Sequence, residues 1–353
     1  IVRFDYESVM RQNRYWHGGD PVVTHFFNAL QAMFPEGERF FMDSARDVRD
    51  MLGKDNIPAE LNEQIRLFIR QEAMHGREHD AWTNALISLG YIGMEGFDLK
   101  LKRDNQWSKK KLKPLWRLSM TAASEHFTAS LAHLFIYKRP DLIEKAASPF
   151  RELLVYHAME EVEHKAVCFD LFKQAKGGYF LRSAGMIFVT IDLLVRLRNR
   201  QEYLLKKDGL WNAKTQKEMR DLLWGKEGIM RVLAPYLLQY FRPDFHPWET
   251  DERRDLVAKY GQEMRVIDAQ QAQAFIGQPG AADAIYQRAR SELAVLLERL
   301  AAADMSTAAV LWQVTSGRLF GLRDLLADAA AQLAAIRDGE ERPTVLLVGE
   351  IYV

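Results

Sequence analysis

The sequence predicts a mainly α-helical protein built on four long antiparallel helices, with extra helices and a small C-terminal segment. Apolar residues recur three and four positions apart from Pro21 to Leu89, where strand-like alternation is almost absent. Glycine and proline separate the segments of helical length along the chain. Two of those segments carry glutamate and histidine at helical spacing. These three observations define the expected fold class.

The four long helices are bounded by recognisable start and stop residues. Asp20 and Pro21 predict a helix start, because aspartate caps a helix and proline is favoured at its first position. Gly53 is expected to end this helix, and Gly177 to end the fourth. A polar, lysine-rich connection is expected at 98–113. The four helices are predicted at residues 22–52, 59–89, 114–137 and 149–176.

The rest of the chain is predicted to add helices and a second, smaller domain. The composition becomes rich in alanine and leucine from about Ala269, so we expect domains at 1–258 and 259–353. The run from Pro343 to Gly349 is typical of a buried parallel strand, which makes the second domain a truncated helical segment ending in a strand. Further helices are predicted at 180–206, 215–240, 281–303 and 306–337, with a closing loop at 241–248.

Composition and charge exclude several functional classes. Lys+Arg and Asp+Glu balance at 48 each, so the chain has no overall basic field that would attract nucleic acid. Its single cysteine, Cys168, rules out a disulfide framework and a thiolate zinc cluster, and fits the reducing cytoplasm. Ile1 to Tyr6 lacks the features of a signal peptide. Because the chain starts without Met and stops abruptly at Val353, we interpret it as a fragment.

The longest apolar run spans 185–195 and is interrupted by Asp192. It is shorter than the ~20 residues that a membrane span needs. We therefore expect a buried helix here and no membrane-spanning segment.

Two predicted helices carry Glu-x-x-His pairs. On an α-helix, residues three, four and seven positions apart share a face, so Glu72, His75 and His79 line up on the second helix. The same spacing aligns three side chains on the fourth helix: His157, Glu161 and His164. Three further glutamates are expected to point away from these faces: Glu78, Glu160 and Glu163.

The other two helices each offer one glutamate among apolar neighbours, Glu38 and Glu125. One Glu from each of two helices and Glu-x-x-His from each of the other two is the arrangement of ferritin-like dinuclear carboxylate sites. Buried carboxylates are very costly unless they are paired or bind metal, and two divalent ions would balance four of them. The candidate ligands are Glu38, Glu72, His75, Glu125, His157, Glu161 and His164, with His79 as a further candidate.

A single Glu-x-x-His pair arises often by chance, and glutamates on helices are usually solvated. Two pairs, with matching glutamates on the intervening helices, favour a metal site instead. Carboxylate and imidazole donors without thiolate suit iron, which we predict, with manganese or zinc as alternatives. His126 and His133 are expected to be ordinary core or surface residues, and Cys168 to pack in the core.

The first ~250 residues resemble the bacterial family described as predicted metal-dependent hydrolases. The resemblance rests on four motifs: Arg14-Tyr-Trp-His-Gly-Gly-Asp-Pro21, Phe34-Pro-Glu-Gly-Glu-Arg-Phe-Phe41, Gln71-Glu-Ala-Met-His-Gly-Arg-Glu-His79 and Phe241-Arg-Pro-Asp-Phe-His-Pro-Trp248. The ligand pattern is also similar to that of di-iron arylamine N-oxygenases, whose fourth helix carries His-x-x-x-Glu-x-x-His, matched here by His157, Glu161 and His164.

The C-terminal tail resembles the start of proteins related to 2-hydroxyacyl-CoA dehydratases and their activases, through the run from Pro343 to Val353. The chain stops where that family would continue, and the tail lacks the cysteines that such an activity requires. We assign the tail no activity.

Three functions follow as hypotheses from the predicted site. The leading one is a di-iron enzyme that oxidises or oxygenates a small organic substrate, with O2 and an electron donor as partners and a homodimer as one assembly that fits. The second is a metal-dependent hydrolase that uses a metal-activated water. The third is a non-catalytic, ferritin-like metal-binding protein, for which a cage of many subunits would be expected.

Overall fold

The computed structural model describes residues 4–249, 288–289, 292–293, 296 and 321–335. The chain divides into two units, one of residues 3–260 and one of residues 261–353 together with residues 1–2. Each unit is described by itself. The described parts of both are helical, and their one β-bridge joins His17 to Ala146. The mainly α fold class is confirmed.

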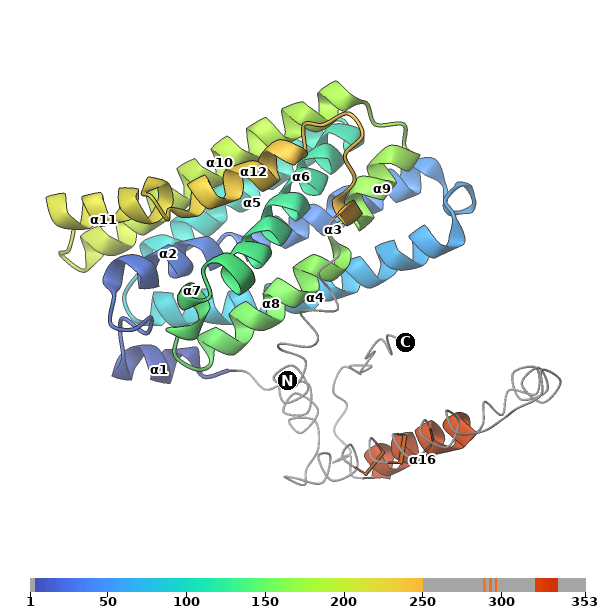
Figure 1. The fold of residues 1–353 in the computed structure, drawn as a ribbon, viewed down its shortest axis with the longest axis horizontal. Helices are drawn as coiled ribbons and strands as arrows, with labels where there is room; N and C mark the ends of the chain where they lie inside the picture. Colours follow the sequence, from blue (N-terminus) through green and yellow to red (C-terminus); the bar gives the residue numbers. More distant parts are fainter. Residues whose placement is uncertain (1–3, 250–287, 290–291, 294–295, 297–320, 336–353) are drawn as a thin grey trace. The chain divides into compact units, whose positions relative to one another are not determined.

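Four helices form a ring at the centre of the first unit: α3 (Phe34–Leu52), α4 (Ala59–Ser88), α6 (Pro114–His133) and α8 (Phe150–His164). Helix α3 packs along α4, α4 contacts α8, α8 packs on α6, and α6 returns to α3 (Figure 1). This closed ring is the ferritin-like four-helix bundle that the sequence predicts.

Shorter and peripheral helices surround this ring (Figure 1). In the first unit they are α1 (Tyr6–Gln12), α2 (Pro21–Gln31), α5 (Gly93–Lys111), α7 (Asp141–Glu144), α9 (Val167–Gln174), α10 (Tyr179–Lys207), α11 (Ala213–Trp224) and α12 (Ile229–Gln239). Single turns occur at η1 (Lys54–Asn56) and η3 (Pro247–Glu249), and η2 (Leu134–Lys138) continues α6 as a π-helix. The second unit contributes α16 (Leu322–Ala335).

Three helices predicted as continuous are interrupted. The segment 22–52 breaks at Ala32–Met33, because Pro35 lacks the N–H that would bind the carbonyl group of Gln31. The segment 149–176 breaks directly after His164, and 215–240 breaks at 225–228, where Gly225 and Gly228 lie. The predicted start is confirmed, since Asp20 Oδ1 accepts hydrogen bonds of 2.8 and 3.1 Å from the first backbone N–H groups of α2.

The polar connection predicted at 98–113 is wrong, because helix α5 covers Gly93–Lys111. Its buried residues, Met94, Leu101 and Ser108, lie seven positions apart and form one narrow stripe. The other residues of α5 are exposed or half-buried and form ion pairs such as Lys100–Asp104 at 2.8 Å. A helix that is polar on most of its surface shows little apolar periodicity, which explains the error.

The prediction of a buried helix at 185–195 is also wrong in part. One side of α10 packs tightly on α6, where a Cβ at Gly185 would lie 2.7 Å from the Ser119 carbonyl oxygen. The other side is open, and Ile187 and Ile191 are more than half exposed. None of the helices in the described ranges combines the length and apolarity that crossing a membrane would require.

A buried polar contact fixes α2 against α4. Asn28 Oδ1 accepts hydrogen bonds from the indole N–H groups of Trp16, at 3.2 Å, and Trp82, at 3.0 Å. All three side chains are buried. This contact anchors one end of α4, the helix that carries three of the candidate ligands.

Most of the predicted C-terminal elements lie outside the described residues. Helix α16 falls within the segment predicted at 306–337. The strand predicted at 343–349 and most of the helix at 281–303 are not among the described residues. The domain boundary near residue 260 stays a prediction.

Candidate metal centre

The eight candidate residues lie together inside the ring of four helices. Helix α3 contributes one, α4 three, α6 one and α8 three. All are buried, and none is more than 7% exposed. Their side-chain oxygen and nitrogen atoms form three groups that could each hold an ion: Glu38, His79 and His157; Glu72, His75 and His164; and Glu125, Glu161 and His164. That each residue is a metal ligand stays a prediction.

A glycine makes room for the candidate ligand from α3. Gly76 lies in the middle of α4, where glycine lowers helix stability by roughly 0.5–1 kcal/mol relative to alanine. A Cβ at this position would lie 3.0 Å from Glu38 Oε2. The close approach of the Glu38 carboxylate to the backbone of α4 therefore accounts for the glycine.

His164 connects two carboxylates from different helices. Its Nδ1 lies 2.7 Å from Glu125 Oε2 on α6, and its Nε2 lies 3.4 Å from Glu72 Oε1 on α4. Because the three side chains come from three helices, the contact can form only when the bundle has closed. This is one half of the centre.

In the other half of the cluster, side chains from α3, α4 and α8 lie around His157. His157 Nε2 lies 2.6 Å from Glu161 Oε1, and its Nδ1 lies 2.6 Å from His79 Nε2. His79 Nε2 is also 3.9 Å from Glu38 Oε1. The second oxygen of Glu161 accepts a hydrogen bond of 2.5 Å from Thr128 Oγ1. Sequence spacing did not identify Thr128, although it lies three positions after Glu125 on the same helix.

The prediction that Glu160 points away from the site is wrong. It is buried, its Oε2 contacts His75 Nε2, and its Oε1 accepts a hydrogen bond of 2.8 Å from the Tyr156 hydroxyl. Glu160 lies four positions before His164, so helical spacing alone allowed two glutamates to accompany that histidine. The predictions for Glu78 and Glu163 agree with the structure, since these contact Tyr6 and Gln71.

Burial and mutual repulsion shift the pKa values of the cluster. Burial, together with the charges of neighbouring glutamates, raises the pKa of Glu38 and of Glu72 well above the usual range. Burial also raises the pKa of Glu125, to about 7, although the nearby His164 lowers it in part. Such carboxylates are hard to keep ionised without a cation nearby.

The histidines divide into two kinds. Burial, with the neighbouring imidazoles, lowers the pKa of His75 and of His79 well below the usual range, so both are neutral and can donate a lone pair. For His164 burial acts in the same direction, but the charge of Glu125 outweighs it and raises the pKa to about 9. Burial alone would raise the pKa of Glu161, but hydrogen bonds from His157 and Thr128 lower it.

Several buried oxygen and nitrogen atoms of the cluster, each able to coordinate a metal ion, have no hydrogen-bond partner among the described residues. They are both oxygens of Glu38, both oxygens of Glu72, Oε1 of Glu125, Nδ1 of His75, Nδ1 of His79 and Nε2 of His164. Leaving such atoms unpaired is costly, by roughly 1–3 kcal/mol or more for each charged group. Divalent cations would satisfy several of them at once, so the donor set fits metal ions.

Aromatic rings close the cluster against water. The Phe34 ring packs 4.8 Å from the His79 ring and 4.5 Å from the His157 ring. On the other side the Phe68 ring lies 5.2 Å from the His164 ring. One ring therefore packs against the His79 and His157 imidazoles, and another against the His164 imidazole.

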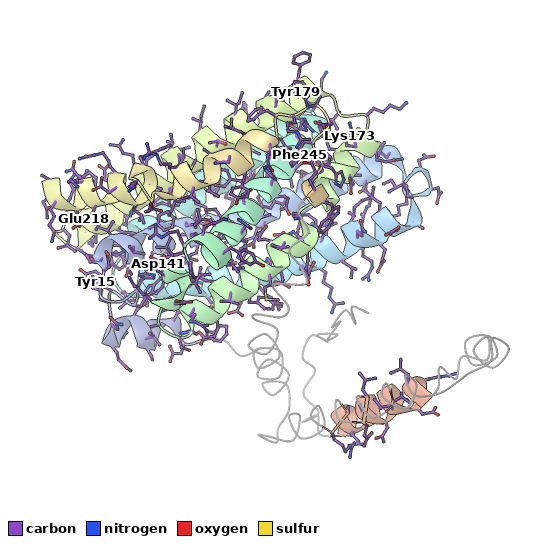
Figure 2. All side chains as sticks on the ribbon, in the orientation of Figure 1. Tyr15, Asp141, Lys173, Tyr179, Glu218 and Phe245 are labelled. Atoms are coloured by element: carbon purple, nitrogen blue, oxygen red, sulfur yellow. The ribbon has the colours of Figure 1, made fainter. Side chains whose placement is uncertain are left out.

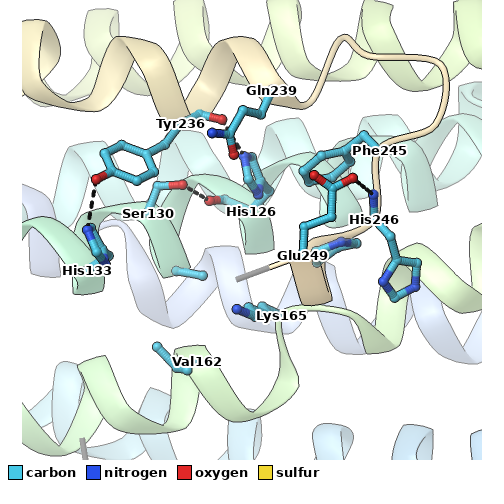
Figure 3. Close-up of a pocket in the computed structure, with 12 residues that line it drawn as sticks. His126, Ser130, His133, Val162, Lys165, Tyr236, Gln239, Phe245, His246 and Glu249 are labelled. Atoms are coloured by element: carbon cyan, nitrogen blue, oxygen red, sulfur yellow. Dashed lines mark hydrogen bonds between the residues drawn. The ribbon is translucent and has the colours of Figure 1, made fainter. Parts of the chain in front are cut away.

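Residues of α6, α8 and α12 line a cleft, and some of them are next to the candidate ligands in sequence (Figure 3). His126 Nε2 donates to the Tyr236 carbonyl group at 3.0 Å, and His133 Nε2 lies 2.9 Å from the Tyr236 hydroxyl. Both histidines therefore bind α12, as expected for residues outside the metal site. Cys168 is fully buried in the core, which agrees with its prediction.

Comparison with known families agrees with this geometry. The model of the family described as predicted metal-dependent hydrolase matches residues 1–251. The chain belongs to this family. The predicted metal-dependent hydrolase region thus includes all four helices of the ring and every candidate ligand. Neither the curated proteins nor the solved structures contain a significant match to this member of the family.

Proposed function

We propose that this member of the predicted metal-dependent hydrolases is a di-iron enzyme that uses O2 to oxidise or oxygenate a small organic substrate. The observation that supports the proposal is the convergence of eight buried carboxylate and imidazole side chains from four helices. Bundle sites with four glutamates and the histidines of two Glu-x-x-His pairs hold two iron or two manganese ions, and the cluster contains this set with two further histidines. The similarity of the α8 pattern to that of di-iron N-oxygenases favours iron.

The residues that would hold the ions are the eight candidates, with Glu160 beside them. Glu38, His79 and His157 would hold one ion, and Glu72, His75 and His164 the other. Glu125 and Glu161, which form the third group with His164, would complete the set of candidate ligands. Two iron ions would supply the redox chemistry of O2 activation when bound.

The protein's own groups orient the donors and exclude water. Thr128 fixes one oxygen of Glu161 by its 2.5 Å hydrogen bond, which leaves the other oxygen facing His157. Tyr156, which is partly exposed, fixes Glu160 in the same way. Tyr156 and Glu160 therefore form a hydrogen-bonded route from the partly exposed edge of α8 to His75, along which a proton can move. Phe34 and Phe68 keep water from the cluster.

The description of the family favours a second candidate function, metal-dependent hydrolysis. In that case an ion would acidify a bound water, and the same donors would hold zinc or manganese. Such an enzyme would need neither O2 nor an electron donor. Oxygen dependence therefore separates the two functions.

The decisive experiment starts from protein purified without added metal. We expect about two iron ions per chain by elemental analysis, and an optical change when the anaerobically reduced protein meets O2. Glu72→Ala and Glu161→Ala should each remove iron and the optical change. Glu163→Ala is the matched control, because this α8 side chain accepts a hydrogen bond from Gln71 and belongs to none of the three groups of candidate ligands.

Two results would contradict the di-iron proposal. One is protein that binds zinc or manganese and turns over a substrate under strict anaerobiosis, which would support the hydrolase. The other is protein that binds no metal while Glu72→Ala leaves its stability unchanged.

A further inference from the structure

One outer face of α10 carries a concentrated apolar surface. Half of the twelve large apolar side chains that the described residues expose lie between Tyr179 and Val195 on this helix. Exposed apolar residues that are scattered singly need no explanation, but a contiguous patch marks an interaction site. Helix α10 lies along the upper edge of the bundle in Figure 1, and Figure 2 labels Tyr179 at the start of this helix.

The exposed residues form one stripe along the helix axis, which we call the α10 stripe. Phe180 is 85% exposed, Phe188 46%, Ile187 54%, Ile191 59% and Val195 53%. Their spacing of three, four, seven and eight positions places them within a face ~100° wide. Ala184 lies on the same face between Phe180 and Ile187. The stripe ends toward the C-terminus, where this face continues with Arg198, Glu202 and Lys206.

The α10 stripe is complementary to itself in the antiparallel direction. Its midpoint falls between Ile187 and Phe188, so a two-fold axis there places these two side chains opposite each other. The same register places Phe180 opposite Val195 and Ala184 opposite Ile191. Each larger side chain then meets a smaller one, which is how facing helices interdigitate.

Charge and area agree with this arrangement. No charged residue occurs between Ser183 and Ile191, so two copies of this stretch can meet without burying a charge. The five exposed side chains offer roughly 500 Å² per chain, on the basis of typical side-chain areas. Two copies would bury ~1,000 Å², which reaches the lower limit for a specific protein interface.

We propose that the α10 stripe is the contact surface of a homodimer, in which α10 of one chain packs antiparallel on α10 of a second chain. The interface is isologous, so each chain presents the same residues to the other. The metal centre lies within the helical ring of each chain, and dimerisation leaves it complete in both.

The first test is the size of the full chain in solution. We expect a dimer by analytical ultracentrifugation, and Ile191→Glu should weaken its association at least roughly 100-fold, because two carboxylates would be buried without partners. Leu238→Glu is the matched control, since Leu238 is 65% exposed but lies on α12, outside the stripe. Both variants change exposed positions, and unchanged melting temperatures would show that both are folded.

The second test measures the register with introduced cysteines. In this register, position 187 of one chain and position 187 of the other lie ~1.5 Å apart along the helix axis. Ile187→Cys should therefore form an interchain disulfide on oxidation. Val195→Cys lies ~22 Å from its own copy and should not, but it should cross-link to Phe180→Cys when the two variants are mixed. Native Cys168 is fully buried and does not interfere.

A monomeric chain, or a dimer that Ile191→Glu does not weaken, would overturn the proposal. Equal self-cross-linking of Val195→Cys and Ile187→Cys would also overturn the antiparallel register. A monomer that floats with anionic lipid vesicles, and loses this binding in Ile191→Glu, would identify the α10 stripe as a lipid contact instead.

Discussion

His157 Nε2 lies 2.6 Å from Glu161 Oε1, one helical turn further along α8. Each partner is also held from another helix, His157 by His79 on α4 and Glu161 by Thr128 on α6. Contacts from two other helices therefore hold the candidate donors of α8 in place, which lowers the cost of ordering them when an ion binds.

Thr128→Val should weaken metal binding without unfolding the chain. The substitution removes the hydrogen bond to Glu161 but keeps the branched shape of the side chain. Loss of such an orienting contact typically lowers metal affinity by 10–100-fold, and we expect about 10-fold. Competition with a chelator would measure it. Ser130→Ala is the control on the same helix, because Ser130 Oγ donates only to the His126 carbonyl group among the described residues.

Gly76→Ala should disturb the metal centre, whereas Gly96→Ala should not. Alanine at 76 would place its Cβ 3.0 Å from Glu38 Oε2 and push the carboxylate away. Gly96, on α5, has no atom within 4 Å of such a Cβ. We expect lower metal content for Gly76→Ala, and a gain of roughly 0.5–1 kcal/mol in unfolding free energy for Gly96→Ala. Equal metal content in both variants would contradict the account given for Gly76.

Glu72→Gln should change stability in opposite directions with and without metal. Burial raises the pKa of Glu72 well above its usual range, so the carboxylate destabilises the metal-free bundle. We expect the metal-free variant to be more stable than the metal-free parent by about 1–3 kcal/mol. With metal present the parent should be the more stable, because binding adds to its stability by mass action. Denaturant unfolding with and without chelator would show whether the order reverses.

His17 should make stability depend on pH independently of the metal. Burial lowers the pKa of His17, whose Nε2 lies 3.0 Å from the Leu142 carbonyl oxygen. The unfolded chain therefore binds a proton below pH ~6.5, while the folded chain stays neutral. This contribution to stability is complete above that pH and is lost as the pH falls below it. His17→Gln keeps a donor for the carbonyl group and should reduce the slope between pH 5 and 7 in unfolding experiments. An unchanged slope would rule out His17 as the source.

The convergence of the candidate ligands could be predicted because each side chain lies on a long helix, where spacing fixes direction. Glu72, His75 and His79 needed only the helical repeat. Glu160 was missed because the repeat allows two glutamates near His164, and only packing against α4 shows that His75 meets one of them. The role of Thr128 could not be predicted from the sequence, because an uncharged residue on a buried helix usually packs without a specific role.

Helix boundaries were less predictable than helix positions. The break before α3 could have been recognised from Pro35, which removes one backbone donor. Helix α5 was missed because only one residue in seven is buried along its stripe of Met94, Leu101 and Ser108. The exposure of Ile187 and Ile191 could not be predicted, because an apolar helix in a sequence does not show which side its neighbours cover.

The candidate donors of the metal centre are distributed over more than one hundred residues, from Glu38 to His164. As the chain leaves the ribosome, α3 and α4 emerge with half of the donors, and α8 supplies the last three only later. A nascent chain therefore offers an incomplete set, so ion capture belongs to the late stages of assembly. Once captured, an ion ties together distant points of the chain and holds the newly closed bundle shut.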